Sequence, residues 1–474
     1  MDLNRFIWDD FRFKDLILKP SLNIYNNLAE VENIRGRLSV ELEIFPNPLI
    51  SWEFECLDET ELRDLKPDEL DTIFFKKPLN NIDANKLRII KPYSRSLSTW
   101  LDVSDRYCAV RVKGYSREFC IGDLNADINA LTFYWPNFRL HAICEAHNIP
   151  HDDSRWKHAH KDMFMVEEPF LDNWMISIST RDSSFQWLNP IARNTGIMLT
   201  TIGKIHGNGK NDLRTIKFVD IKKTIGQLSL LISFANGGYT YPILYEGHRL
   251  PPEDGRSSMV FKHFDAKRQI TPLEQFSNTW FVRESDLGKL IRCNRNFSSA
   301  LDNQSWYDSY LFILTNYLLA TSTNSWQIAA SSIGAVLERL SYLLLVEDEN
   351  DMKEKANNIC LFKPGMRPQS EEIIKRILTK IGLTKDRKIN DIDHVASFIS
   401  VRNDAVHPIN KKMSVEERWK CIRYGVQWAE EGILWRLGYA GWYRDRISSS
   451  KEENKEYAAN PGVFVPRYFV QNMG

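Results

Sequence analysis

Two hydrophobic patterns divide the chain. The N-terminal part alternates apolar and polar residues with the period of two that is typical of half-buried strands, whereas the C-terminal part repeats apolar residues every three or four positions, as amphipathic helices do. The sequence therefore predicts an α+β protein, with a β-rich domain over residues 1–298 and an all-α helical bundle over residues 299–447. A polar linker and a C-terminal tail are expected over residues 448–474.

Strand-like runs recur through the N-terminal part. The predicted strands are Gly36–Phe45, Tyr107–Lys113, Ile216–Asp220, Leu228–Phe234 and Tyr239–Tyr245. Asn236, Gly237 and Gly238 read as a hairpin turn between the last two runs. A sheet-rich module of this kind would suit sensing of a trigger or restraint of the following domain, but no residue in it identifies the trigger.

Five helices are expected in the C-terminal part. They cover Tyr310–Ala320, Trp326–Leu345, Ser370–Gly382, a segment from Asn390 to about His407, and a long helix that opens with a capping box at Ser414–Glu417. Pro408 predicts that the fourth helix ends at His407. We expect buried stripes at Ile392, Val395, Ala396, Ile399 and Val406, and at Val415, Trp419, Ile422, Val426, Ala429, Ile433 and Leu437.

The most informative residues lie at the end of the fourth helix, where Arg402, Asn403 and His407 follow one another closely. RNA carries its own nucleophile, the ribose 2′-hydroxyl, so cleavage needs an acid–base group near neutral pH and positive charge for the phosphorane. His407 supplies the titrating group, Arg402 a planar cation suited to phosphate oxygens, and Asn403 a group that can orient either. A second copy across a two-fold axis would complete such a site.

These residues match a known pattern. Arg402, Asn403 and His407 fit the Arg-Asn-x-x-x-His motif of HEPN ribonuclease domains without a gap. The segment Trp326–Leu345 resembles the first long helix of such domains, in which an acidic residue at the position of Glu338 faces the site.

The wider chain also resembles one branch of that family. With its long N-terminal region, it is similar to the ApeA-type HEPN proteins of bacterial anti-phage defence, and Leu131–Phe138 resembles part of the ApeA N-terminal domain. The resemblance implies a homodimer or higher oligomer that cleaves RNA, with tRNA as a substrate class, without a metal or other cofactor. It also implies a role in abortive infection and a phage-derived trigger as a further partner.

Simpler interpretations remain open for each residue. Arg402 would also fit as a surface ion-pair partner of Asp404 or Glu416, Asn403 as a helix cap, and His407 as a side chain favoured by the helix dipole. Glu338 would fit as a solvated residue on the flank of its helix. The alternative function is a non-catalytic HEPN dimer that serves as an interaction or sensor protein.

Charge and histidine distribution add two further candidates. Lysine plus arginine and aspartate plus glutamate both number 62, so RNA would have to bind at a local patch, for which Lys411 and Lys412 are candidates. A histidine-rich stretch with His141, Cys144, His147 and His151 has metal-ligand residue types, but its spacing matches no standard zinc site. We therefore expect no bound metal.

The compartment follows from the cysteines and from hydrophobicity. The seven cysteines are scattered singly, which suits reduced thiols, and early charged residues argue against a signal peptide. We expect that no apolar run approaches the roughly 20 residues needed to span a bilayer. We expect a cytoplasmic protein with no membrane partner.

Overall fold

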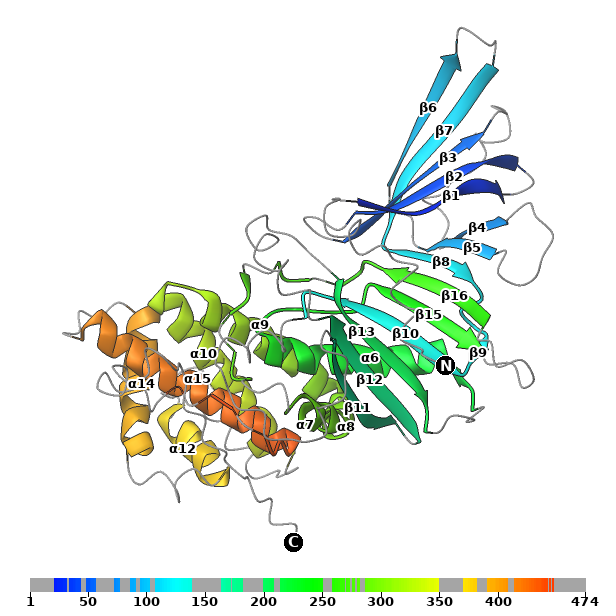
Figure 1. Ribbon diagram of the computed structural model, residues 1–474. Coiled ribbons are helices and arrows are strands. Elements are labelled where there is room, and N and C mark those ends of the chain that lie inside the picture. The colour runs from blue at the N-terminus through cyan, green and yellow to red at the C-terminus, as the bar shows by residue number, and fades with distance from the viewer. Residues whose placement is uncertain are drawn as a thin grey trace. The chain divides into compact units, whose positions relative to one another are not determined.

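The computed structural model describes most of the chain between residues 21 and 446 (Figure 1). The longer stretches outside this description are residues 1–20, 57–71, 77–85, 139–162, 182–198, 209–213, 250–257, 349–369, 382–389, 408–412 and 447–474. The chain divides into two compact units. The first comprises Met1–Phe138, Arg155–Ser229 and Tyr239–Glu274, and the second comprises Arg139–Ser154, Leu230–Gly238 and Gln275–Gly474.

The first unit is built on one large antiparallel sheet. Its strand order is β11-β12-β13-β10-β15-β16-β8-β5-β4-β1-β2-β3-β7-β6, and β14 and β9 form a separate small pair. The strands up to β8 are β1 (Ser21–Val31), β2 (Ile34–Glu43), β3 (Leu49–Cys56), β4 (Thr72–Lys76), β5 (Lys86–Ile90), β6 (Ser94–Asp102), β7 (Tyr107–Ser116) and β8 (Glu118–Gly122). The others are β9 (Asp127–Ile128), β10 (Ala130–Pro136), β11 (Met163–Leu171), β12 (Trp174–Arg181), β13 (Leu199–Gly207), β14 (Ile216–Lys217), β15 (Leu244–Arg249) and β16 (Ser258–Asp265).

One helix, α6 (Phe218–Asn236), interrupts the series of strands. In its first half Ile221, Ile225 and Leu228 are fully buried, and Ser229 Oγ accepts a hydrogen bond of 3.2 Å from Trp135 Nε1 on β10. The apolar spacing of these residues follows the helical period and buries one face of α6 against the sheet. The division between the two units falls within this helix.

The predicted strands over Ile216–Asp220 and Leu228–Phe234 are therefore largely wrong, because only Ile216–Lys217 is a strand and the rest is α6. The expected hairpin turn is wrong as well. Gly237 has a left-handed φ of 76° and its N–H donates to Ser233 O at 3.1 Å, so it closes the C-terminus of α6. The following strand, β15, begins only at Leu244.

The second unit is a helical bundle. Its described helices are α7 (Leu287–Arg292), α8 (Asn294–Leu301), α9 (Gln304–Ser322), α10 (Trp326–Tyr342), α12 (Ser370–Lys380), α14 (Asn390–Val406) and α15 (Val415–Leu437). α10 continues into a π-helical turn over Leu343–Glu347. The α+β class is thus confirmed, and so are the predicted helices. The domain limits predicted from the sequence stay a prediction.

Helix α10 forms the centre of the bundle. Its residues Ile333, Val336, Leu337 and Leu340 are at most 1% exposed, and α9, α14 and α15 all pack against it. Together with the π-helical turn it forms the segment Trp326–Glu347, which is long and apolar enough to cross a membrane by length and composition. The expectation that no segment approaches that limit is wrong. Burial within the bundle accounts for its apolar composition, because 67% of the apolar window is buried.

Buried polar groups attach the chain after α15 to the bundle. Glu430 is fully buried, and its carboxylate accepts hydrogen bonds from Arg446 Nη2 at 2.7 Å and from Tyr317 Oη at 2.6 Å. The backbone N–H of Arg446 donates to Gln427 Oε1 at 2.7 Å. A charge at this depth is stable only because each partner is satisfied, so these bonds fix the path of the chain beyond Leu437.

Candidate functional site

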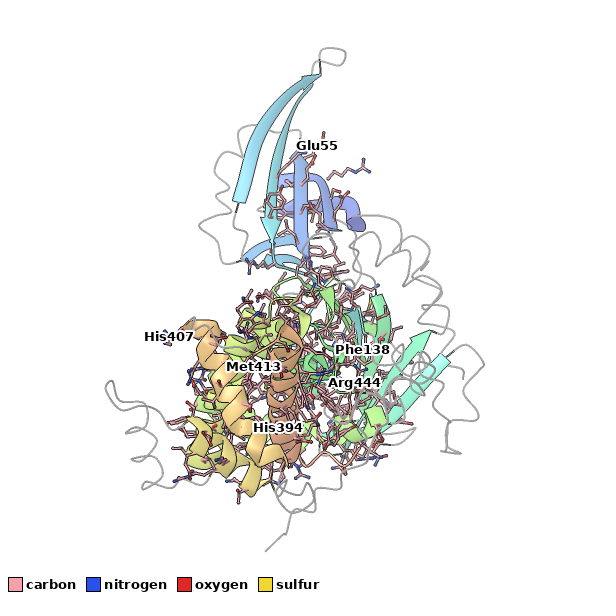
Figure 2. The ribbon with its side chains drawn as sticks, turned by 90° about the vertical axis from the view of Figure 1, so that its left-hand side faces the viewer. Glu55, Phe138, His394, His407, Met413 and Arg444 are labelled. Carbon is pink, nitrogen blue, oxygen red and sulfur yellow. The ribbon has the colours of Figure 1, made fainter. Side chains whose placement is uncertain are left out.

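Helix α14 carries the first two motif residues, Arg402 and Asn403, in its last turn. The helix ends at Val406, as the following proline predicts, and the His407 N–H still donates to Asn403 O at 2.7 Å. His407 is exposed, and Figure 2 shows it at the outer end of the helix. The imidazole is thus placed by the helix but left accessible to solvent.

Arg402 and Glu338 form an ion pair between two helices. Arg402 Nη2 lies 2.8 Å from Glu338 Oε1 on α10, and each side chain is 27% exposed. Arg402 Nη1 also donates to Asn403 Oδ1 at 3.3 Å. A guanidinium has five N–H donors, so this arrangement fixes its plane while leaving donors for an anion.

Gly334 makes room for this arginine. A Cβ built on Gly334 would lie 2.8 Å from Arg402 Cγ, closer than real Cβ contacts come. Gly334 and Glu338 lie one turn apart on the same side of α10. The stem of Arg402 therefore crosses α10 at the glycine, and its guanidinium reaches the carboxylate one turn further on.

A second ion pair joins the neighbouring elements. Arg418 Nη2 on α15 lies 2.9 Å from Asp404 Oδ2, and Asp404 is only 7% exposed. The Arg418 guanidinium also stands over the ring of Trp326 at the start of α10, 4.2 Å from its centroid. The end of α14 and the starts of α10 and α15 are thus tied together. Asp404 is engaged here, so Arg402 has Glu338 as its acidic partner instead.

The predicted apolar stripe of α14 needs correction. Val395 is buried, and among the described side chains of α14 the other buried apolar positions are Phe398 and Val401, whereas Ala396 and Val406 are exposed and Ile399 is partly exposed. The side chain of Ile392 lies outside the described part. Phe398 fits against α15 at Gly425, where an added Cβ would lie 2.6 Å from its ring. The stripe is rotated relative to the predicted one, and this rotation turns Arg402 toward α10.

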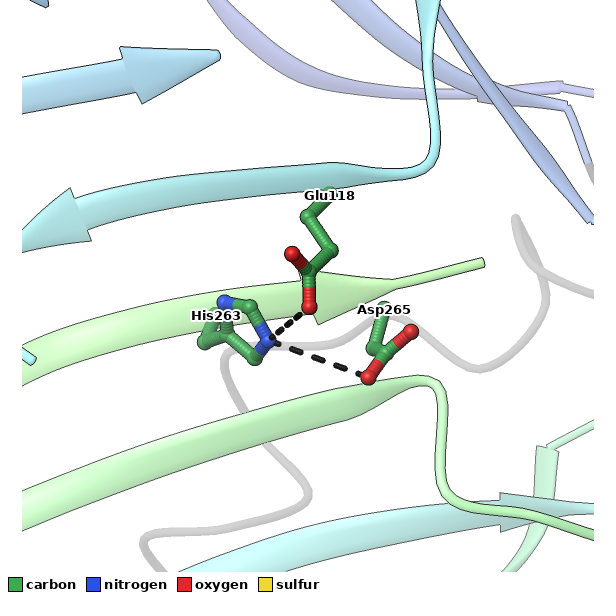
Figure 3. Close-up of side chains that lie close together, drawn as sticks. All are labelled: Glu118, His263 and Asp265. Atoms are coloured by element: carbon green, nitrogen blue, oxygen red, sulfur yellow. Dashed lines mark ion pairs between the residues drawn. The ribbon is translucent and has the colours of Figure 1, made fainter. Parts of the chain in front are cut away.

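A different cluster of ionisable groups lies in the first unit (Figure 3). Glu118 on β8 and Asp265 on β16 face each other directly across the sheet, and His263 lies beside them. All three are at most 6% exposed. Among the described residues they form a group with the ligand types and proximity that a metal ion needs.

An ammonium group already occupies the centre of this cluster. Lys222 Nζ on α6 lies 2.6 Å from Asp265 Oδ2, 3.1 Å from Glu118 Oε1 and 3.0 Å from His263 Nε2. An ammonium has three donors and no acceptor, so His263 Nε2 accepts and the ring is neutral with its proton on Nδ1. The second oxygen of Glu118 is 2.6 Å from Lys267 Nζ. Two lysines thus balance two carboxylates, whereas His263 Nδ1 is buried without a hydrogen-bond partner among the described residues.

The environment shifts the pKa values of two members. Burial by itself raises the pKa of Glu118, but the charge of Lys222 and the contact with the Lys267 ammonium outweigh it and hold this pKa far below its usual value. Burial lowers the pKa of His263, and the ammonium of Lys222 lowers it further against the opposing effect of the carboxylates. Both shifts favour the charge distribution that the geometry indicates.

Comparison with known proteins gives two family matches. Residues 123–272 match the YopA central domain, and residues 303–457 match the YopA C-terminal domain. The chain is similar to YopA in both parts. These families are associated with phages and with defence. No curated protein and no solved structure matches the chain.

The candidate residues fall within these matches. Arg402, Asn403, His407 and Glu338 lie in the part similar to the YopA C-terminal domain. Lys222, His263 and Asp265 lie in the part similar to the YopA central domain, whereas Glu118 just precedes it. The structure therefore gathers the four predicted site residues around the last turn of α14, in the YopA-like C-terminal part, with Glu338 of α10 joined to Arg402.

Several candidates lie outside the described residues. Lys411 and Lys412, proposed to contact RNA, are in the stretch 408–412. The histidine-rich candidates His141, Cys144, His147 and His151 are in the stretch 139–162. The cluster around Lys222 was missed by sequence reasoning, because its members come from β8, α6 and β16 and have no common spacing. The one local hint was the His-x-Asp pair within a strand, which is too short a pattern to predict a site.

Proposed function

We propose that the chain is a metal-independent endoribonuclease of the HEPN type, which cleaves RNA in abortive anti-phage defence. The observation that carries the proposal is the ion pair between Arg402 Nη2 and Glu338 Oε1 at 2.8 Å, with Asn403 beside it and an exposed His407 just beyond the helix end. This set supplies a cation, a positioning amide and a proton-transfer group, and the similarity to defence-associated families supports the biological role.

The proposed reaction uses the RNA's own 2′-hydroxyl as the nucleophile. His407 takes the proton of this hydroxyl, or delivers one to the departing 5′-oxygen, and Arg402 stabilises the charge on the phosphorane. Asn403 orients the phosphate or the imidazole. The P–O bond to the 5′-oxygen breaks as the bond to the 2′-oxygen forms. The products are a 2′,3′-cyclic phosphate and a 5′-hydroxyl.

Glu338 acts in this scheme as a positioning residue. Its carboxylate holds the Arg402 guanidinium without covering it, because both side chains remain partly exposed. A homodimer or higher oligomer would bring a second copy of His407, so that base and acid come from two chains. tRNA is the first substrate class to test. The cytoplasm is the expected compartment, and a phage component acting on the β-rich part is the expected trigger.

A cleavage assay with matched variants tests the proposal. Purified wild type, His407→Ala and His206→Ala are incubated with total tRNA and a mixed RNA pool in EDTA, and the new ends are mapped. His206 is a suitable control because it is a partly exposed histidine on β13, bound to Glu167 and Ser177. We expect cleavage by wild type and His206→Ala, none by His407→Ala, and cyclic phosphate at the 3′ ends.

Other outcomes favour the competing functions. Equal cleavage by wild type and His407→Ala would place the activity elsewhere. If cells expressing His407→Ala resist phage as well as the wild type does, the non-catalytic HEPN dimer is the better description. Cleavage that EDTA abolishes would contradict the metal-independent mechanism.

A further inference from the structure

The apolar stripe of α15 is not buried along its whole length. From Ile422 onward its members are at most 4% exposed, whereas Val415 is 56% exposed and Trp419 is partly exposed. The apolar stripe thus begins about two helical turns before the part of α15 that is buried in the bundle. A large aromatic ring and an aliphatic side chain at the start of a helix are left facing solvent.

These residues line a hollow. Val415, Glu416, Trp419 and Arg423 surround an open depression of about 660 Å³. Its volume lies within the ~300–1,000 Å³ of typical small-ligand sites. Trp419 and Arg423 are one helical turn apart, so the indole and the guanidinium are neighbours along one face of α15.

Two cationic side chains, Lys420 and Arg423, lie on this part of α15. In the part of the chain that the structure describes, Arg423 and Lys420 make no ion pair, and both side chains are exposed. Other charges nearby are occupied: Glu417 closes the capping box through Ser414, with its Oε2 2.7 Å from Ser414 N, and Arg418 is bound to Asp404. The hollow therefore combines the ring of Trp419 with an arginine that makes no ion pair within the described part of the chain, and with the carboxylate of Glu416.

The hollow lies beside the candidate site. Helix α14 ends at Val406 and α15 begins at Val415, so His407 and the first residue of the hollow are close neighbours in sequence. Arg418, which precedes Trp419, is bound to Asp404, the neighbour of Asn403. A polymer whose phosphate reaches Arg402 and His407 would pass this face of α15 with an adjacent nucleotide.

We infer that Trp419 and Arg423 form a stacking subsite for an unpaired base of the RNA substrate. The inference rests on the proposed ribonuclease function and adds a binding subsite to it. Aromatic side chains next to arginine bind single-stranded nucleic acid by stacking, largely without regard to base identity. Glu416 also lines the hollow and disfavours a phosphate inside it, so the base occupies the hollow and the backbone passes along its Arg423 side, toward Lys420.

A second copy of the chain is a less suitable occupant. Around a two-fold axis this face would meet its own copy, and on each copy the two cations Lys420 and Arg423 would stand against the single carboxylate of Glu416, so that the contact carries an excess of positive charge. Such a contact loses free energy through like-charge repulsion, whereas the phosphates of RNA gain from the same two charges. Charge complementarity therefore favours RNA.

Binding of an RNA oligonucleotide that contains one 2-aminopurine tests the subsite. The full chain with His407→Ala is used so that the RNA stays intact, and Trp419→Leu, Trp419→Phe and Arg423→Gln are added to it. Stacking on Trp419 quenches 2-aminopurine fluorescence. We expect Trp419→Leu to lose the quenching and to bind about 5- to 100-fold more weakly, the range expected for one stacked base. Trp419→Phe should retain most of both.

Phe312→Leu is the matched control. Phe312 on α9 is 40% exposed and has the Arg339 guanidinium over its ring at 5.4 Å, so it is another surface aromatic–arginine pair on the bundle. This variant should bind RNA and quench as the parent does. Circular dichroism and the melting temperature verify that each variant is folded.

The possible results separate the inference from the proposed function. RNA affinity and quenching unchanged in Trp419→Leu would overturn the subsite, whereas the nuclease would stand if wild type still cleaves and His407→Ala does not. Quenching that depends on Trp419, without cleavage by wild type, would support the subsite and count against the nuclease. If Trp419→Leu instead halves the mass in light scattering at unchanged RNA affinity, the face is a contact between copies and the inference is wrong.

Discussion

Arg402 reaches Glu338 across the contact between α14 and α10, with Nη2 and Oε1 2.8 Å apart. Since Gly334 lies under the stem of this arginine, the position of the guanidinium depends on both a carboxylate and an absent side chain. Neither of them needs to touch RNA for cleavage to depend on them. A substitution at Glu338 or Gly334 should therefore slow cleavage although it removes no group that contacts the RNA.

Replacement of Glu338 by glutamine should slow cleavage by about 10-fold or more, because the neutral amide holds the guanidinium less firmly in the position that meets the phosphorane. The unfolding free energy should change by only about 1 kcal/mol or less, since the pair is partly exposed. Glu372→Gln is the control, because Glu372 pairs with Arg376 on the surface of α12. Equal cleavage rates for the two variants would show that Glu338 has no positioning role.

Gly334→Ala should separate activity from stability. Alanine favours a helix over glycine by about 1 kcal/mol, which offsets part of the strain, but its Cβ forces Arg402 away from its present path. We expect a melting temperature close to that of the wild type together with a reduced cleavage rate. Gly226→Ala on α6, where a Cβ meets nothing within 4 Å, should leave cleavage unchanged. Full activity in Gly334→Ala would contradict the described role of this glycine.

Lys222→Met should lower the unfolding free energy by about 2–4 kcal/mol, because Glu118 and Asp265 would face each other without a counter-charge. The loss is expected below that of a fully buried pair, since 29% of the Lys222 side chain is exposed. The emptied position has metal-ligand geometry, so Zn²⁺ or Mn²⁺ should raise the melting temperature of this variant more than that of the wild type. Lys223→Met, at the exposed neighbouring position, should show neither effect.

Stability should fall as the pH decreases below about 6.5. The pKa of His263 is lowered in the folded state from its ordinary value of 6.5, so its contribution is complete above pH 6.5 and is lost as the pH falls toward the lowered value. Each such group changes the unfolding free energy by at most about 1.4 kcal/mol per pH unit. Glu118, whose pKa is also lowered, adds a second loss below its ordinary value of 4.5. Denaturant titrations at several pH values measure both.

His263→Gln identifies the first of these losses. Glutamine can still accept the hydrogen bond from Lys222, but it does not titrate. The variant should therefore lose the pH dependence that sets in below 6.5 and keep the one that sets in below 4.5. A profile identical to that of the wild type would assign the upper step to another group.

Sequence patterns that involve residues close together in the chain predicted the helices and their ends correctly. The capping box at Ser414 and Glu417 is present, and α10 extends from Trp326 as its periodicity indicates, because a helix end and a helical stripe depend on residues close in sequence. The run Leu228–Phe234 was misread as a strand since a short, continuous apolar segment suits a buried strand and a buried helix equally. Only the preceding Ile221 and Ile225 distinguish the two.

Long-range contacts were beyond the sequence pattern. The motif identified Arg402, Asn403 and His407, but the partner of Arg402 depends on how two helices pack, and periodicity alone assigned Val406 to the core when Phe398 and Val401 take that place. The charge cluster around Lys222 assembles from three elements far apart in sequence. Such a set becomes visible only when the sheet register places Glu118 opposite Asp265.

The cation at the centre of that cluster is part of the polypeptide. Because Lys222 belongs to the chain, the counter-charge of Glu118 and Asp265 arrives with the fold itself and is not drawn from ions in the surroundings. The charge balance of this cluster is therefore set by pH, through His263 and Glu118.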